Sequence, residues 1–228
     1  MTAAAPAPTS MIDRIAQILD AFDGPGSLTL TQVVSRTGLP RSSAHRILEH
    51  LVRVRWLRRD EHSYHLGLRM LELGTLAGHH HELRGAATAH LHDLAHSTGM
   101  VVHLTVLDGP DIVYLDKVGG RFGVRVPSRV GGRAPAHVTG AGKALLAYAD
   151  ESVVRSVLSR PIRVPTSASI ASEHRLRSEL ARVQDRGVAF DREESATGIG
   201  CVGAPLGTPG SPVAAISVCG PIGRMNFE

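Results

Sequence analysis

The residues best suited to chemistry in the early part of the chain are arginines. Seven of them lie between positions 36 and 59, where Glu49 is the single acid. A surface with this charge attracts a polyanion through the release of counterions, and nucleic acid is the first candidate. A solvated helix face gives the same composition, so the surrounding pattern has to decide between the two.

Three helices are expected to support these arginines. The first covers 11–22 behind the capping residue Ser10 and has an apolar stripe at helical spacing. The second, over 32–36, is capped by Thr31 and closed by Gly38. The third covers 41–52 and starts at Pro40, a favoured first-turn residue. The inward stripes of the first and third helices are Ile12, Ile15, Ala16, Leu19 and Phe22, and Ala44, Ile47, Leu48 and Leu51.

The last two helices and a following hairpin predict a DNA-binding element. Two short helices around a tight turn are typical of a helix-turn-helix, whose second helix fits a major groove about 12 Å wide. Strands over 56–59 and 64–66 then form a wing, where basic side chains contact phosphates without reading sequence. The expected DNA contacts are Gln32, Arg41, Ser42, Ser43, His45, Arg46, Arg58 and Arg59.

With these elements in place, the chain resembles the IclR family of bacterial transcriptional regulators. The segment 28–51 is similar to that family's helix-turn-helix, and 64–67 is similar to the end of its wing. Four segments of the second half are similar to family signatures in the same order, namely 135–147, 186–194, 198–205 and 214–221. The resemblance therefore spans almost the whole chain.

The resemblance implies an α+β protein, in which an N-terminal winged helix-turn-helix is joined by a helical linker to a GAF-like α/β effector-binding domain. The residues agree with this mixture of elements. They predict strands over 101–107, 112–118, 188–190, 198–204 and 213–218, helices over 140–149 and 173–185, and connecting helices over 66–76 and 83–95. The expected division is a disordered tail (1–9), a DNA-binding domain (10–66), a linker (67–84) and an effector domain (85–228). That last domain stops before the family's usual final helix, whose absence would expose apolar surface.

The resemblance also points to an effector pocket. Its residues would be Val126, Ala134, Gly140, Ala141, Asp191, Ile199, Cys201, Ser217 and Cys219. The N–H groups at a helix start around Gly140 favour an anion, so a small organic acid is the expected effector, oriented by the Ser217 hydroxyl. These glycines can instead serve tight packing, Cys201 can be a small buried hydrophobe, and Asp191 can cap a turn. Cys219 departs from the family, where serine is frequent, and a thiol donates only weak hydrogen bonds.

Two further groups of residues have side chains of types that could do other chemistry. Cys201, His137 and Asp191 offer a nucleophile, a base and an orienting carboxylate, but nothing in their spacing brings them within hydrogen-bond reach, so no enzyme is expected. The run His79, His80, His81 and Glu82 suits a divalent metal by residue type only, because adjacent helix residues point in different directions. No metal or cofactor is therefore expected. The rival to a regulator is a metabolite-binding module or enzyme that uses the helix-turn-helix only for assembly.

Composition limits the remaining possibilities. With 43% hydrophobic and 20% charged residues the chain is typical of globular proteins. Its first ten residues lack the features of a signal peptide, and no apolar run approaches the roughly 20 residues of a membrane span. Two cysteines are too few for a disulfide-framed secreted fold and fit a reducing cytoplasm. The expected protein is a cytoplasmic repressor or activator that binds double-stranded operator DNA and a small-molecule effector, as a homodimer or dimer of dimers.

Overall fold

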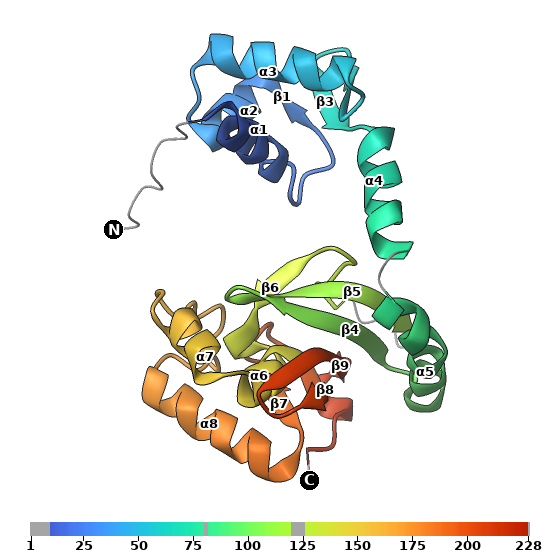
Figure 1. The fold of residues 1–228 in the computed structure, drawn as a ribbon, viewed down its shortest axis with the longest axis vertical. Helices are drawn as coiled ribbons and strands as arrows, with labels where there is room; N and C mark the ends of the chain where they lie inside the picture. The colour runs from blue at the N-terminus through green and yellow to red at the C-terminus, as the bar shows by residue number, and fades with distance from the viewer. Residues whose placement is uncertain (1–9, 80–81, 120–125, 228) are drawn as a thin grey trace. The chain divides into compact units, whose positions relative to one another are not determined.

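The computed structural model describes residues 10–79, 82–119 and 126–227. The chain divides into two compact units, residues 1–80 and 81–228, and each is described by itself (Figure 1). The tail expected over 1–9 lies outside the described residues, as do His80 and His81.

The first unit is a winged helix-turn-helix. Its elements are α1 (Met11–Asp20), β1 (Leu28–Thr29), α2 (Leu30–Thr37), α3 (Arg41–Arg53), β2 (Leu57–Asp60), β3 (Ser63–Leu66) and α4 (Leu68–His79). β3 pairs antiparallel with both β2 and β1, so the expected two-stranded wing is part of a three-stranded sheet. β1 has only two residues, so it is too short for an alternation of apolar and polar side chains to predict it as a strand.

Local side chains determine where the helices of this unit begin. Ser10 caps α1, as predicted. α2 begins earlier than predicted, because Thr29 rather than Thr31 is its cap, and Gln32 completes the capping box by accepting the Thr29 amide. Pro40 precedes α3 as its N-cap instead of being its first helical residue.

The core of the first unit confirms one predicted stripe and corrects the other. The α3 residues Ala44, Ile47, Leu48 and Leu51 are all buried, as expected. On α1 the prediction was wrong at the first turn, because Ile12 is 77% exposed whereas Ile18 is fully buried. α1 therefore packs through Ile18, and Phe22, just after the helix, joins the same core, whereas Ile12 in the first turn lies outside it.

The second unit is a six-stranded antiparallel sheet with helices on both faces, which confirms the α+β class. Its elements are α5 (Glu82–Thr98), β4 (Val101–Asp108), β5 (Asp111–Gly119), β6 (Arg133–Pro135), η1 (Ala136–Val138), α6 (Gly140–Tyr148), α7 (Glu151–Leu158), α8 (Glu173–Arg186), β7 (Ala189–Arg192), β8 (Ile199–Thr208), β9 (Ser211–Pro221) and η2 (Ile222–Arg224). The strand order is β6-β5-β4-β9-β8-β7. This order makes neighbours of strands that are far apart in the sequence.

Alternation along the strands sorts their side chains onto two faces of the sheet. One face, which carries Val102, Leu104 and Ala214, packs against Ala87 and Leu91 of α5. The helix expected over 83–95 as a connector is therefore a cover for the sheet.

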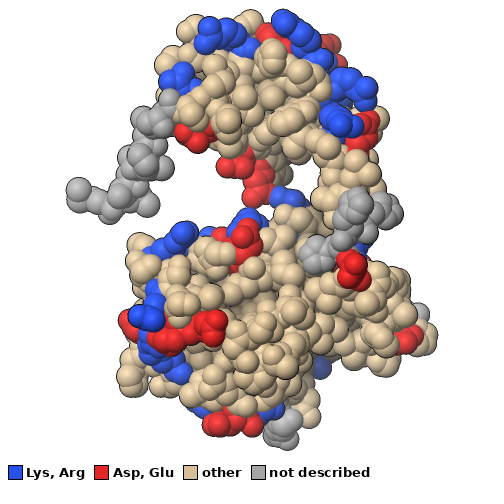
Figure 2. Space-filling view, in the orientation of Figure 1, with Lys and Arg blue, Asp and Glu red and all other residues tan. Residues whose placement is uncertain are grey.

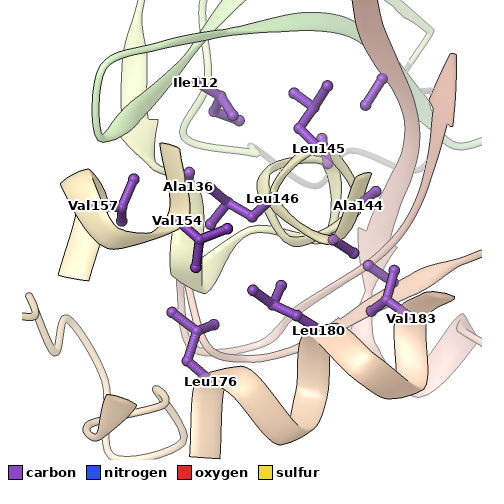
Figure 3. Close-up of a cluster of buried hydrophobic side chains, with 14 residues drawn as sticks. Ile112, Ala136, Ala144, Leu145, Leu146, Val154, Val157, Leu176, Leu180 and Val183 are labelled. Carbon is purple, nitrogen blue, oxygen red and sulfur yellow. The ribbon is translucent and has the colours of Figure 1, made fainter. Parts of the chain in front are cut away.

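The other face of the sheet carries α6, and α8 packs outside that helix. Every residue of α6 except the last is buried, so this helix is enclosed by protein. Figure 3 shows Leu176, Leu180 and Val183 projecting from α8 into the apolar cluster around α6, with Ile112 of the sheet across the same cluster. These contacts hold the start of α6 in place against the sheet.

The last described residues fold back on the outer strands. A Cβ added at Gly200 would lie 2.9 Å from atoms of Ile222, Met225 and Phe227, so these three side chains close over β8. The Phe227 ring also meets that of Phe190 edge to face, with centroids 5.4 Å apart. This segment therefore packs against the outer strands β7 and β8.

Candidate functional site

The first candidate site is the outer face of α3 together with the β2–β3 hairpin. Ser42, His45 and Arg46 are exposed on the side of α3 opposite its core stripe, and Arg58 is exposed on β2. Arg41, also exposed, begins the helix. Figure 2 shows basic side chains gathered over the part of the unit that carries α3 and the hairpin. An exposed helix of this charge can enter a major groove and contact base edges and phosphates.

Four of the expected DNA contacts have partners inside the unit. Arg41 Nη1 donates to Thr31 Oγ1 at 3.3 Å, and His45 Nε2 lies 3.9 Å from Glu49 Oε1. Arg59 donates to Glu49 Oε1 at 3.1 Å, and the Tyr64 hydroxyl donates to the same oxygen at 2.9 Å. The single acid of the basic stretch therefore holds the wing against α3. Gln32 Oε1 accepts the Thr29 amide at 2.8 Å, which leaves the NH₂ group of Gln32 for any further contact.

The second candidate site is a cavity of about 440 Å³ in the second unit. All nine residues expected in the effector pocket line it, namely Val126, Ala134, Gly140, Ala141, Asp191, Ile199, Cys201, Ser217 and Cys219. The strand order explains how they meet, since β4, β9, β8 and β7 lie side by side and contribute alternate residues to one wall. The volume is that of a site for a small organic molecule.

The start of α6 forms another wall of the cavity. Thr139 caps the helix by accepting the Gly142 amide at 3.1 Å. Gly140 and Ala141, which line the cavity, carry first-turn N–H groups that no carbonyl within the helix can accept. The helix can reach this position because Gly203 has no Cβ. A Cβ there would lie 2.4 Å from the Gly140 carbonyl carbon. Glycine at position 203 thus lets the positive end of a helix rest directly on β8.

Asp191 supplies the negative charge of the cavity. Its side chain is fully buried and accepts the Glu194 amide at 2.7 Å and the Ser195 hydroxyl at 2.5 Å. Burial raises the pKa of Asp191, and the hydrogen bonds from Ser195 and Glu194 oppose that rise. The carboxylate therefore organises the turn after β7 and borders the cavity as well.

Sequence reasoning missed a buried ion pair behind this wall. Lys143 is 1% exposed, and its Nζ lies 2.5 Å from Glu194 Oε1 and 3.8 Å from Glu179 Oε1. Burial raises the pKa of Glu194, and the charge of Lys143 opposes the rise. The sequence signal for this pair was a lysine inside an otherwise apolar helix. A charged side chain is rarely buried unless it is paired, so such a lysine predicts a buried acidic partner.

Two aromatic rings of the cavity were also missed. His103 and Tyr114 line it with ring centroids 4.9 Å apart, and His103 Nε2 lies 2.8 Å from Ser128 Oγ. Burial lowers the pKa of His103 to about 4 and raises that of Tyr114 to about 12, so both side chains are neutral at pH 7. For His103 a sequence signal was available. Side chains alternate between the two faces along the strand predicted over 101–107, which places His103 and Thr105 on one face.

The two cysteines were expected as separate thiols, and the structure corrects this. Cys201 and Cys219 face each other across β8 and β9 with Cα atoms 4.2 Å apart, and they form a disulfide. The bond lies in the cavity wall, where Cys219 Sγ is 3.6 Å from His103 Nδ1. In this form neither sulfur can donate a hydrogen bond.

The alternatives to a binding site gain no support from the geometry. The Cys201 sulfur is held in the disulfide, and His137 Nε2 lies 2.7 Å from the Arg163 carbonyl oxygen, so neither is placed as nucleophile or base. Among the described side chains no group of three or more His, Cys, Asp or Glu could hold a metal ion. In the same part of the chain, no helix combines the length and apolar character needed to cross a membrane.

Comparison with known proteins identifies the family. Residues 11–61 match the family model "IclR helix-turn-helix domain", and residues 75–228 match "Bacterial transcriptional regulator IclR C-terminal". The chain is 32% identical over 199 residues to the HTH-type transcriptional regulator XynR of Escherichia coli, covering 86% of this chain and 79% of XynR. It is 31% identical over 216 residues to the transcriptional repressor IclR of the same organism, covering 89% and 76%.

Solved structures give the same result. An IclR homolog from Microbacterium hydrocarbonoxydans, crystallised with 4-hydroxybenzoate, has a TM-score of 0.81 at 28% identity, over 93% of this chain and 90% of that one. An IclR regulator from Alicyclobacillus acidocaldarius has a TM-score of 0.83 at 26% identity, over 95% and 89%. These relatives are regulators rather than enzymes, and their likeness extends over both units. The chain belongs to the IclR family of bacterial transcriptional regulators, with a helix-turn-helix for DNA and a C-terminal domain for an effector.

Proposed function

We propose that this regulator binds an operator through its first unit and that a small organic acid in the 440 Å³ cavity changes its affinity for that operator. The observation that carries the proposal is the cavity itself, whose wall includes the start of α6 at Gly140 and Ala141. Helix N-termini favour anionic groups, and the neighbouring Ser217 hydroxyl is placed to orient one. The relative crystallised with 4-hydroxybenzoate supports an acid of that size.

The proposed division of labour follows the expected domains. Residues 10–66 contact DNA, 67–84 form the linker and 85–228 bind the effector. The DNA contacts are Gln32, Arg41, Ser42, Ser43, His45, Arg46, Arg58 and Arg59. The effector contacts are Val126, Ala134, Gly140, Ala141, Asp191, Ile199, Cys201, Ser217 and Cys219. Operator binding places the protein in the cytoplasm with the chromosome.

We further propose that the regulator works as a homodimer or dimer of dimers. Two reading heads are needed for two half-sites of a palindromic operator. On α4, Leu68 and Leu71 are 65% and 64% exposed, which is unusual for leucine and suits burial by a second copy. Light scattering on the full chain tests this, with Leu71→Glu expected to weaken self-association. A monomer at micromolar concentration in the unmodified chain would contradict it.

A thermal-shift experiment with 4-hydroxybenzoate and related acids tests the sensor. A ligand at 100 times its dissociation constant adds about 2.7 kcal/mol to stability. Ser217→Ala is expected to weaken binding several-fold, whereas Ser211→Ala, at the exposed end of the same strand, leaves binding unchanged. No shift with any acid of the panel, or equal effects of the two variants, would contradict the proposal.

A salt titration of DNA binding tests the reading head. Arg46→Ala is expected to lower the slope of log affinity against log salt by about one if it contacts a phosphate, or to cost about 1–3 kcal/mol at one base position if it reads a base. Arg175→Ala removes an exposed arginine from the second unit and is the control for net charge. Binding that ignores sequence and is unchanged by Arg41→Ala and Arg46→Ala would indicate a helix-turn-helix used only for assembly.

A further inference from the structure

We infer that Cys201 and Cys219 are a reversible dithiol–disulfide pair that alters the wall of the effector cavity according to its redox state. The pair itself is independent of the effector. Its effect on effector binding rests on the proposed function above. The experiments below separate the two.

The position of the disulfide gives small reagents access to it. Cys201 and Cys219 are 7% and 3% exposed, and both line the cavity. A molecule small enough to enter the cavity can therefore reach the sulfurs, whereas a protein of ordinary size cannot. This distinguishes the pair from a disulfide buried in an apolar core, which no reagent reaches without unfolding.

The compartment argues against a permanent structural bond. Operator binding takes place in the cytoplasm, where disulfides of mesophilic proteins are usually transient and serve catalysis or redox sensing. The chain has only these two cysteines, and the strand register of β8 and β9 places them directly opposite each other. Two opposed cysteines in the wall of a cavity are the arrangement that a sensing pair needs.

The chemistry of the pair balances with ordinary reagents. An organic dithiol reduces the bond by transferring two electrons and two protons: the S–S bond breaks, two S–H groups form, and the dithiol becomes its own disulfide. A peroxide reverses the reaction by accepting the two electrons and the two thiol protons, and its O–O bond breaks to give two molecules of water when the oxidant is hydrogen peroxide.

Reduction changes what the cavity wall can offer a ligand. The disulfide has no hydrogen to donate, whereas each thiol has one. His103 Nδ1, 3.6 Å from Cys219 Sγ, becomes an acceptor for the Cys219 thiol when His103 Nε2 donates to Ser128 Oγ. The Cys219 sulfur also lies 3.7 Å from Ser217 Oγ, so reduction places an S–H donor beside the Ser217 hydroxyl. The sulfurs also move apart to non-bonded separation, so the shape of the wall changes with its hydrogen-bonding pattern.

Thermodynamic linkage makes the coupling measurable in both directions. If the two forms differ tenfold in affinity for an acid, saturation with that acid shifts the midpoint potential of the pair by about 30 mV, because the couple transfers two electrons. The form that binds the acid more tightly is the form that the acid stabilises.

Titration of the full chain in dithiothreitol redox buffers, with acid quenching, maleimide labelling and mass spectrometry, tests the pair. The expected result is one two-electron transition under native conditions, in which Cys201 and Cys219 gain label together, and complete re-formation of the bond with hydrogen peroxide. The variant C219S should carry one labelled cysteine at every potential. A bond that never forms in oxidising buffer, or that resists dithiothreitol until the protein unfolds, would overturn the inference.

Repeating the titration with saturating 4-hydroxybenzoate tests the coupling. At least a tenfold difference in affinity between the two forms is expected, with the matching shift of about 30 mV in midpoint. C219S should bind the acid with one affinity, whatever its value, at all potentials. Equal affinities and equal midpoints would overturn the coupling. If the acid binds neither form, the proposed function fails for this acid and the coupling fails with it, while the thiol titration still decides the redox pair.

Discussion

The two units of this regulator handle charge in opposite ways. In the first unit the arginines of α3 and the wing lie at the surface, and their one acidic partner, Glu49, is itself more than one third exposed. In the second unit Lys143, Asp191 and Glu194 are buried. Charges of the first kind can change with little effect on folding, whereas charges of the second kind are part of the fold. Function and stability are therefore separable in the DNA-binding unit and closely linked in the sensor.

The largest effect expected from this contrast is at Lys143. Lys143→Met leaves the buried Glu194 carboxylate without its cation, and breaking such a pair costs about 3–5 kcal/mol. Urea unfolding of the full chain measures this loss. Arg177→Gln, which removes an exposed partner of Glu151, is the surface control and should change stability little. Equal losses in the two variants would contradict the comparison.

The next largest effect is a pH dependence that comes from His103. The pKa of His103 is about 4 in the folded chain, whereas an ordinary histidine, as in the unfolded chain, has a pKa of 6.5. Between pH 4 and 6.5 the unfolded state therefore binds more protons than the folded state. Stability is therefore full above pH 6.5 and falls by about 3 kcal/mol as the pH drops to 4. His103→Gln should remove this part of the slope, as measured by urea unfolding at a series of pH values. Parallel curves for the two proteins would show that His103 is not the group responsible.

A smaller effect is expected where α6 rests on β8. Gly203→Ala forces the two apart, because the new methyl group would lie 2.4–2.6 Å from backbone atoms of Gly140 and Ala141. Overpacking of this kind costs about 1–3 kcal/mol, and the displaced helix start should lose at least tenfold in affinity for an acid. The control is Gly26→Ala in the first unit, where nothing lies within 4 Å. If calorimetric titration finds normal acid binding in Gly203→Ala, the start of α6 does not contribute to the site.

The smallest effect on stability is expected at Glu49. Glu49→Gln weakens its contacts with Arg59 and Tyr64 at a cost of about 0.2–1 kcal/mol, as for other exposed pairs. The same change removes the single acid from the basic stretch, so affinity for DNA should rise. Fluorescence anisotropy on duplex DNA, together with a melting curve, gives both quantities. Weaker DNA binding would mean that the position of the wing matters more than its charge.

The two units also differ in how well the sequence predicted them. Apart from Gln32, the residues proposed to bind DNA lie within one helix and the next hairpin, so helical periodicity and charge were enough to predict them. The errors were local: Thr29 displaced Thr31 as the cap, and Ile12 is exposed because the core is centred on Ile18. Which of two threonines caps a helix, and which face of a helix points into the core, depend on tertiary contacts. A local pattern of residue types does not contain those contacts.

The cavity could not be derived in this way. Its residues come from all six strands of the sheet, from η1 and α6, and from the loops at 126–128 and 163–165, and only the fold brings them together. Resemblance to a family supplied nine positions, because it carries the topology with it. Resemblance did not supply the disulfide, since Cys219 departs from the family at this position, nor Lys143, whose partner Glu194 lies 51 residues away. Contacts of that separation follow from the fold rather than from local sequence.

The central claim, that occupation of the cavity controls the DNA-binding unit, is tested most directly by one measurement. The affinity of the full chain for DNA from its own upstream region is determined at fixed salt, with and without a saturating acid that thermal shift has shown to bind. Coupling between two sites is typically worth 5- to 150-fold in affinity, and a change of at least fivefold is predicted. The same affinity in the presence and absence of the bound acid would contradict the claim.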